Sequence, residues 1–184
     1  YNGNFDSDGI PLLNYHGSIG LQYNPIAIAQ YGLGNYNLFL STGDKKREDN
    51  FIRSANWLCN NLKENNNKIA VWYHFFDFEY KETLKSPWYS GLAQGMGISL
   101  LLRAYHHSNN NKYKKKAIEA YKSFEFRTDQ GGVIFKDTEG YEWIEEYIIS
   151  EPTHILNGFI WALFGVYDLW KFTGNESAKS FYLS

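Results

Sequence analysis

The apolar residues of the chain gather in three long segments that also contain many small residues. The segments begin at Pro25, Ser90 and His154 and read "PIAIAQYGLGNYNLFLST", "SGLAQGMGISLLLRAYHHS" and "HILNGFIWALFGVYDLWKFTG". Their length and composition indicate helices that are apolar on most of their surface. Helices of this kind are buried on several sides, so we expect them to be inner helices of the fold.

A polar turn and a more amphipathic segment follow each apolar segment. In residues 44–64, Phe51, Ala55, Leu58 and Leu62 recur at helical spacing, with polar and charged residues between them. The lysine-rich residues 111–124 ("NKYKKKAIEAYKSF") have the same pattern, which indicates a solvated outer face rather than a polyanion site. We therefore expect amphipathic outer helices here.

The apolar segments recur with a fixed period. Gln30 and Gln94 are 64 residues apart, and so are Gln94 and Gly158. Helical hairpins that repeat in this way bury their apolar faces by stacking on their neighbours. The pattern predicts a mainly α fold in one domain, residues 1–184: a partial α/α toroid of about three helical hairpins. The third outer helix begins near Asn175 and is cut short at Ser184, so we expect a fragment truncated after residue 184.

The connections between the hairpins are not helical in character. Residues 68–80 ("KIAVWYHFFDFEY") and 131–149 ("GGVIFKDTEGYEWIEEYII") are rich in aromatic and β-branched residues and contain turn signals. They predict short β-hairpins that gather at one rim of the toroid. Functional residues tend to lie on such connections, where rigid elements position them.

Composition narrows the classes of function. The formal net charge of −2 gives no reason to expect nucleic-acid binding. No apolar run approaches the ~18 residues of a membrane span. Cys59 is the single cysteine, and the sequence has no calcium loop, P-loop or dinucleotide motif, so we expect no metal and no cofactor. Aromatic residues make up 18% of the chain, which suits either a carbohydrate-binding groove or an aromatic core.

Three glutamates lie among apolar residues in "YEWIEEYIISEPTHILNGF": Glu142, Glu145 and Glu146. They could form a solvated strand face, a structural pair or the acid/base groups of an active site. Neighbouring residues of a regular strand point to opposite faces. Glu146 and Tyr147 can therefore meet one substrate only if the strand bulges or ends there.

Several stretches resemble the C-terminal domain of D-glucuronyl C5-epimerases: residues 23–33, residues 86–105, and "WIEEY" followed by "ILNGFIWALFGVYDL". The resemblance implies an α/α toroid and an enzyme that inverts C5 of glucuronate units in a polysaccharide, giving iduronate. In animals the substrate is a heparan precursor and the enzyme lies in the Golgi lumen. An extracytoplasmic or Golgi location for this chain is implied by the resemblance only.

The resemblance also implies roles for particular residues. It assigns Glu146 and Tyr147 to catalysis and places Asn157 in the same cleft. The family's other motifs, which carry the second proton-transfer group and the carboxylate-binding arginine, lie further along than Ser184. We therefore expect the isolated chain to lack epimerase activity.

Four further residues are candidates for substrate binding. Trp88 and Tyr89 precede the second inner helix and would form either a sugar platform or a plug for the end of the toroid. Gln30 and Gln94 occupy equivalent positions of the repeat. Their amides need partners within apolar helices, and these are either sugar hydroxyls or protein groups.

Two alternative functions stay open. One is a glycoside hydrolase or polysaccharide lyase on the same toroid, for which Glu79 and Glu146 are the first carboxylate pair to consider. The other is a non-catalytic glycan-binding module. In each case the expected partner is a uronate-containing polysaccharide. A partial toroid would also expose apolar surface, which predicts a homo-oligomer or association with the rest of the protein.

Overall fold

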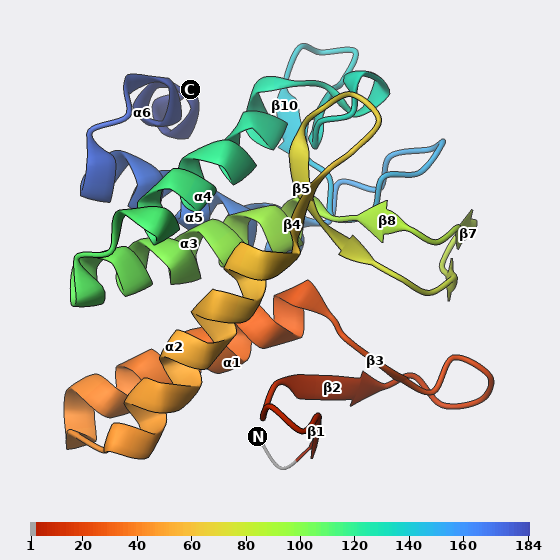
Figure 1. Cartoon of the computed structure of the whole chain (residues 1–184). Coiled ribbons are helices and arrows are strands. Elements are labelled where there is room, and N and C mark those ends of the chain that lie inside the picture. Colours follow the sequence, from red (N-terminus) through yellow and green to blue (C-terminus); the bar gives the residue numbers. More distant parts are fainter. Residues whose placement is uncertain (1–2) are drawn as a thin grey trace.

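The computed structural model describes residues 3–184 and confirms a mainly α, partial α/α toroid built from three helical hairpins (Figure 1). Each hairpin pairs one inner helix with one outer helix. The inner helices are α1 (Pro25–Thr42), α3 (Gly91–Ser108) and α5 (Leu156–Thr173), and the outer helices are α2 (Lys45–Asn61), α4 (Asn111–Tyr121) and α6 (Glu176–Leu183).

Local capping sets the ends of the inner helices. The side chain of Asn24 accepts hydrogen bonds from the backbone N–H groups of Ile26 and Ala27 at the start of α1. Gly43 ends α1 with a left-handed φ of 71°. Asn109 ends α3 in the same conformation. The turns that the sequence indicated are therefore helix caps.

Helix α3 lies at the centre of the fold, between α1 and α5, and every residue from Gly91 to Leu102 is buried. Its backbone touches that of α5 directly. A Cβ atom added to Gly165 would lie 2.0 Å from the carbonyl oxygen of Gly95. Close packing between inner helices thus explains Gly95 and Gly165.

The outer helices are amphipathic, as their periodicity indicated. Phe51, Ala55 and Leu58 of α2 are fully buried against the inner layer. On α4, the buried residues include Tyr113 and Ala117, while several of its lysines are exposed. No helix within residues 3–184 combines the length and apolar character needed to cross a membrane.

The ten strands within residues 3–184 are short and lie toward the end of the bundle where α1 and α3 begin; Figure 1 shows β2, β7 and β8 extending to the right of the helices. This confirms the expected rim of β-hairpins. Two short 3₁₀ helices, Lys122–Glu125 and Thr128–Gln130, lie between α4 and the last hairpin. The antiparallel sheets are β1 (Asn4–Phe5), β2 (Pro11–Asn14) and β3 (Leu21–Gln22); β4 (Leu62–Glu64), β5 (Ala70–His74) and β8 (Trp88–Tyr89); β6 (Phe78–Glu79) and β7 (Thr83–Leu84); and β9 (Ile134–Lys136) and β10 (Glu142–Ile144).

The buried residues form two clusters. The larger one fills the space between the helices. The smaller one lies among the rim strands, and we call it the rim cluster. Phe76, Leu84 and Trp88 are its buried residues, and the partly buried side chains around them are Tyr15, Ile19, Phe78, Tyr147 and Ile149. The rim cluster places the predicted catalytic tyrosine in an aromatic environment.

Candidate active site

The strand that leads to Glu146 and Tyr147 ends before it reaches them. Strand β10 stops at Ile144, and the chain bends at Glu146 and Tyr147. The two side chains are close enough for each to act on the pKa of the other. The geometric condition for both residues to face one ligand is therefore met.

The carboxylate of Glu146 lies beside the first turn of α5. A Cβ atom added to Gly158 would lie 2.3 Å from Glu146 Oε2, so the glycine makes room for this oxygen. Glu146 Oε2 is shielded from solvent and has no hydrogen-bond partner among the described residues. Burial raises the pKa of Glu146, and the neighbouring Tyr147 hydroxyl opposes this rise. A carboxylate of raised pKa with an unpaired oxygen is suited to accept a proton.

Aromatic rings surround Tyr147. Its ring centroid lies 4.7 Å from that of Tyr80, 5.7 Å from that of Phe78 and 6.0 Å from that of Trp88. Burial, followed by the neighbouring carboxylate of Glu146, raises the pKa of Tyr147. The phenol therefore keeps its proton and is a donor at neutral pH.

Contacts within the protein hold the side chains of Trp88 and Tyr89 in the rim. Trp88 is 8% exposed, its Nε1 donates to the carbonyl of Phe76, and its indole stacks on His74 at 3.8 Å. Burial lowers the pKa of His74 to about 3, so this ring is neutral. The Tyr89 hydroxyl donates to the carbonyl of Gly131. Trp88 thus forms a wall of the rim cluster rather than a free platform.

The structure places Gln94 in a fully buried network. Its Oε1 accepts from the backbone N–H of Trp72 at 2.9 Å. Its Nε2 lies 3.1–3.2 Å from the carbonyls of Ala70 and Ala120 and from Ser123 Oγ. Because protein groups occupy both ends of this amide, we leave Gln94 out of the proposed sugar site.

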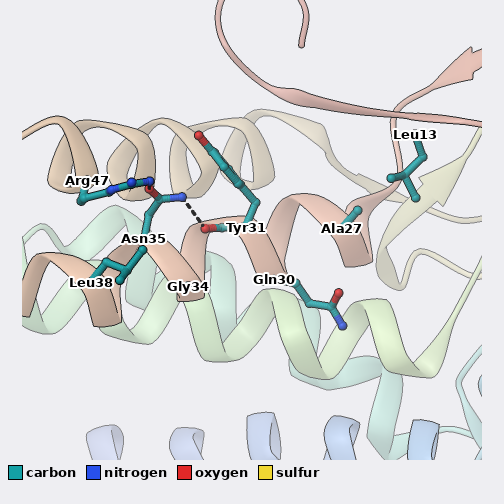
Figure 2. A pocket seen from close by; sticks show the side chains of 8 residues that line it. All are labelled: Leu13, Ala27, Gln30, Tyr31, Gly34, Asn35, Leu38 and Arg47. Carbon is teal, nitrogen blue, oxygen red and sulfur yellow. Dashed lines mark hydrogen bonds between the residues drawn. The ribbon is translucent and has the colours of Figure 1, made fainter. Parts of the chain in front are cut away.

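Gln30 is exposed on α1 and lines a pocket of about 400 Å³ that Figure 2 shows. Neither Glu146 nor Tyr147 contributes to that pocket. Asn157 is the second residue of α5, and its side chain is exposed. It precedes Gly158, the residue that contacts the Glu146 carboxylate, so the structure brings Asn157 close to the catalytic candidates and Gln30 to a different surface.

The three glutamates of the motif occupy three environments. Glu142 is exposed on β10. Glu145 is 1% exposed, and its carboxylate lies 2.6 Å from Nδ1 of His154. Glu146 alone is half-buried with an unpaired oxygen. Glu142 therefore fits a solvated strand face and Glu145 a structural pair, while Glu146 keeps an oxygen without a partner.

Two tyrosines of the rim were not singled out from the sequence. Tyr15 follows β2, and its ring lies 4.4 Å from that of Phe76. Tyr80 lies against Tyr147. Neither belongs to a periodic pattern, and only their aromatic character within strand-like connections signalled them. Among residues 3–184, no group of three or more His, Cys, Asp or Glu side chains is arranged to hold a metal ion.

Solved structures with this architecture include two family 76 glycoside hydrolases. One comes from a bovine strain of Bacteroides thetaiotaomicron (TM-score 0.58, 14% identity, 86% of this chain and 33% of the other). The second, described as a mannosidase, comes from Bacteroides thetaiotaomicron VPI-5482 (TM-score 0.61, 12% identity, 91% of this chain and 43% of the other). At these identities the likeness shows the fold alone.

Sequence relatives give a more specific answer. A D-glucuronyl C5-epimerase of Caenorhabditis elegans is 39% identical over 119 residues, which are 65% of this chain and 19% of the relative. A protein of Methanocaldococcus jannaschii is 31% identical over 125 residues, 66% of this chain and 40% of that protein. The chain thus spans less than half the length of either relative. Because residues 65–184 match the family model described as D-glucuronyl C5-epimerase C-terminus, the chain belongs to that family.

Proposed function

We propose that this chain is part of a uronyl C5-epimerase that converts D-glucuronate to L-iduronate units in an acidic polysaccharide. The observation that carries the proposal is that Glu146, beside Tyr147, has a buried oxygen without a hydrogen-bond partner. C5 of a glucuronate bears a hydrogen α to a carboxylate. Inversion needs a base on one face, a proton donor on the other, and groups that stabilise the enolate-like intermediate.

In this proposal Glu146 is the base. Its raised pKa makes Glu146 a stronger base than an ordinary carboxylate. The difference between its pKa and that of the weakly acidic C5 proton is therefore smaller. Tyr147 holds Glu146 in place and keeps its own proton for hydrogen bonding to the sugar. Phe78 and Tyr80 offer ring surface on which a sugar face can pack, and Asn157 adds a polar group at the start of α5.

The cation for the substrate carboxylate is proposed to come from outside this chain. Arg103 pairs with Asp168, and Arg47 lies near Asp44 and Asn35. No lysine or arginine is among the groups that shift the pKa of Glu146 or Tyr147. We therefore propose that residues 1–184 alone do not catalyse epimerisation.

The test is deuterium uptake at C5 of a glucuronate-containing polysaccharide in D₂O. The protein is assayed with any natural flanking sequence retained. We expect Glu146→Gln and Tyr147→Phe each to lower uptake by about 10²-fold or more, and the exposed Glu142→Gln to leave it unchanged. Absence of uptake by the wild-type protein would refute the proposal, and robust uptake by residues 1–184 alone would refute its second part.

The same incubation separates the alternative functions. The fold shared with family 76 glycoside hydrolases makes hydrolysis the second candidate. In a hydrolase, Glu79 would be the second carboxylate beside Glu146. Glu79 is exposed and accepts a hydrogen bond from Thr83 Oγ1 at 2.9 Å. A hydrolase would shorten the polysaccharide, a lyase would generate ultraviolet-absorbing unsaturated ends, and a binding module would retain the polysaccharide without exchange. An epimerase leaves the chain length unchanged.

A further inference from the structure

The hairpin formed by β6 and β7 is tied to the segment that follows Tyr147. Glu82, in the turn of this hairpin, accepts two hydrogen bonds from Ser150: one from its backbone N–H at 2.7 Å and one from its Oγ at 2.6 Å. The two residues are 68 positions apart in the sequence. This contact, which we call the Glu82–Ser150 clamp, joins the tip of the hairpin to the connection between β10 and α5.

The base of the same hairpin is closed independently of the clamp. Asp77 accepts a hydrogen bond from the Lys85 ammonium at 2.7 Å and another from the backbone N–H of Ser86 at 2.9 Å. Between base and tip, Phe78 pairs with Leu84 in the antiparallel ladder. The hairpin is therefore a closed unit of its own, and the clamp determines where its tip lies rather than whether the hairpin forms.

Two rings of the hairpin lie against Tyr147. The ring centroid of Phe78 is 5.7 Å from that of Tyr147, and the centroid of Tyr80 is 4.7 Å from it. Tyr80 is 41% exposed and lies only two residues before Glu82. An exposed ring at a hairpin tip is fixed by few packing contacts, so its position depends on the hydrogen bonds that hold the tip.

The chemistry of Glu82 suits a contact within the protein. Hydrogen bonds from the Ser150 hydroxyl and backbone N–H lower its pKa, so this carboxylate is ionised at neutral pH. Hydrogen bonds to an ionised acceptor are stronger than those between neutral groups. A negative charge at this exposed site repels an acidic polysaccharide. Direct binding of such a substrate therefore does not explain a carboxylate here, whereas the clamp does.

We propose that Glu82 is a positioning residue, which holds the rings of Phe78 and Tyr80 where they can pack on a sugar of the polysaccharide. The inference rests on the proposed epimerase function, in which these rings bind the sugar beside Glu146. Glu82 acts through Ser150 and does not touch the substrate. Because a sugar face packs on the rings before and during proton transfer, the clamp contributes to substrate binding and not to the chemical step.

Steady-state rates of deuterium uptake at C5 test this role in the protein with any natural flanking sequence retained. We expect Glu82→Ala to raise KM for the polysaccharide by about tenfold and to leave kcat within about twofold of wild type, as the loss of uniform binding does. Removing a negative charge would by itself lower KM for an acidic substrate, so the two effects have opposite signs. A fall in kcat at unchanged KM, or no change in either, would overturn the inference.

Three variants separate positioning from a general effect of mutation. Glu82→Gln keeps an acceptor for the Ser150 N–H and a donor for its Oγ, so KM should stay within about threefold of wild type. Ser150→Ala removes one of the two contacts, and combining it with Glu82→Ala should raise KM no further than Glu82→Ala alone. Glu142→Ala, at an exposed site on β10, should leave KM unchanged. An equal rise of KM in Glu82→Gln and Glu82→Ala would show that the clamp is not the cause.

Amide hydrogen exchange tests the clamp without substrate. Glu82→Ala should speed the exchange of the Ser150 amide by about tenfold or more, and Glu82→Gln and Glu142→Ala should not. Unchanged exchange in Glu82→Ala would refute the clamp itself. A wild-type protein that protects the Ser150 amide but takes up no deuterium at C5 would instead refute the proposed function and, with it, the role of Glu82 in substrate binding.

Discussion

Glu145 and His154 form a hydrogen-bonded pair that closes the segment between β10 and α5. His154 Nδ1 lies 2.6 Å from Glu145 Oε1, while Glu145 Oε2 accepts from the backbone N–H groups of Thr153 and His154 at 3.3 and 3.4 Å. The pair spans the residues that carry Glu146 and Tyr147. It therefore ties the position of the catalytic candidates to the start of α5.

Replacing Glu145 with Ala should destabilise the protein by about 1.5–3 kcal/mol, because hydrogen bonds to a buried acidic group are lost together. Glu142→Ala, three residues earlier at an exposed site on β10, should change the free energy of unfolding by no more than about 0.5 kcal/mol. Urea denaturation of both variants measures the difference. Equal effects would show that the Glu145–His154 pair contributes nothing to stability.

Gln94 and Gln30 offer a second matched comparison, since the sequence period makes them equivalent and the structure does not. Gln94→Ala removes partners of Trp72 N and of three other buried groups, so we expect a loss of at least about 2 kcal/mol. Gln30→Ala, at an exposed site, should stay within about 0.5 kcal/mol of wild type. Thermal or urea unfolding measures the stability of both variants. A loss of stability in Gln30→Ala as large as that in Gln94→Ala would contradict the prediction.

Glu146 should make stability depend on pH in an unusual direction for a carboxylate. Its pKa in the folded state is raised above the ordinary 4.5 by burial, so the folded state holds this proton more tightly than the unfolded state. The contribution of Glu146 to stability is present below the unfolded value and is lost as pH rises through the folded value. Glu146→Gln should therefore match wild type near pH ~4 and exceed it by pH ~8.

Unfolding free energies of wild type and Glu146→Gln at several pH values measure this gain. The exposed Glu142→Gln controls for the general effect of removing one negative charge. If the advantage of Glu146→Gln were largest in acid and vanished at neutral pH, the assignment of a raised pKa would be wrong.

The architecture was accessible from the sequence because helix periodicity, small-residue content and capping residues are local. The equivalence of Gln30 and Gln94 was misleading for a physical reason. Gln94 faces β5, the end of α4 and the first 3₁₀ helix and is therefore buried, whereas Gln30 on α1 is exposed. A repeat therefore predicts equivalent backbone positions but not equivalent burial.

Glu146 and Tyr147 were selected from the sequence by resemblance, and their geometry could not be predicted from it. The direction of Glu146 depends on where β10 ends and on the missing side chain of Gly158, which lies twelve positions further along. Tyr15 depends on a long-range contact between the loop after β2 and the rim strands. Neither relationship leaves a periodic signal in the chain.

Helix α5 exposes an apolar stripe, which predicts association. Leu156, Ile160, Trp161 and Phe164 are 61%, 41%, 48% and 51% exposed. Contiguous apolar surface of this kind marks contact sites, so we expect residues 1–184 to self-associate at micromolar concentration. Phe164→Lys should weaken the association by about tenfold or more in sedimentation velocity, because it buries a charge at the contact. Leu183→Lys, on α6, is the exposed control, and a wild-type chain that stays monomeric would contradict the prediction.

The contact between α3 and α5 gives the sharpest stability test, because two helical glycines lie in opposite environments. A Cβ atom at Gly165 would meet the Gly95 carbonyl at 2.0 Å, so Gly165→Ala must separate the helices. We expect it to cost about 1–3 kcal/mol or more. Gly34, within α1, has no atom within 4 Å of an added Cβ. Gly34→Ala should instead stabilise the protein by about 0.5–1 kcal/mol, since alanine loses less backbone entropy in a helix.

Gly165→Ala is expected to lower the stability of the protein and Gly34→Ala to raise it. Because the directions are opposite, thermal and chemical unfolding should give the same ranking of the two variants. If Gly165→Ala were neutral, α3 and α5 would not be in backbone contact, and the arrangement of inner helices would need revision. If Gly34→Ala were destabilising, another group would occupy the space beside α1. Because Gly34 lines the pocket that also holds Gln30, that second outcome would identify this pocket as a covered surface in solution.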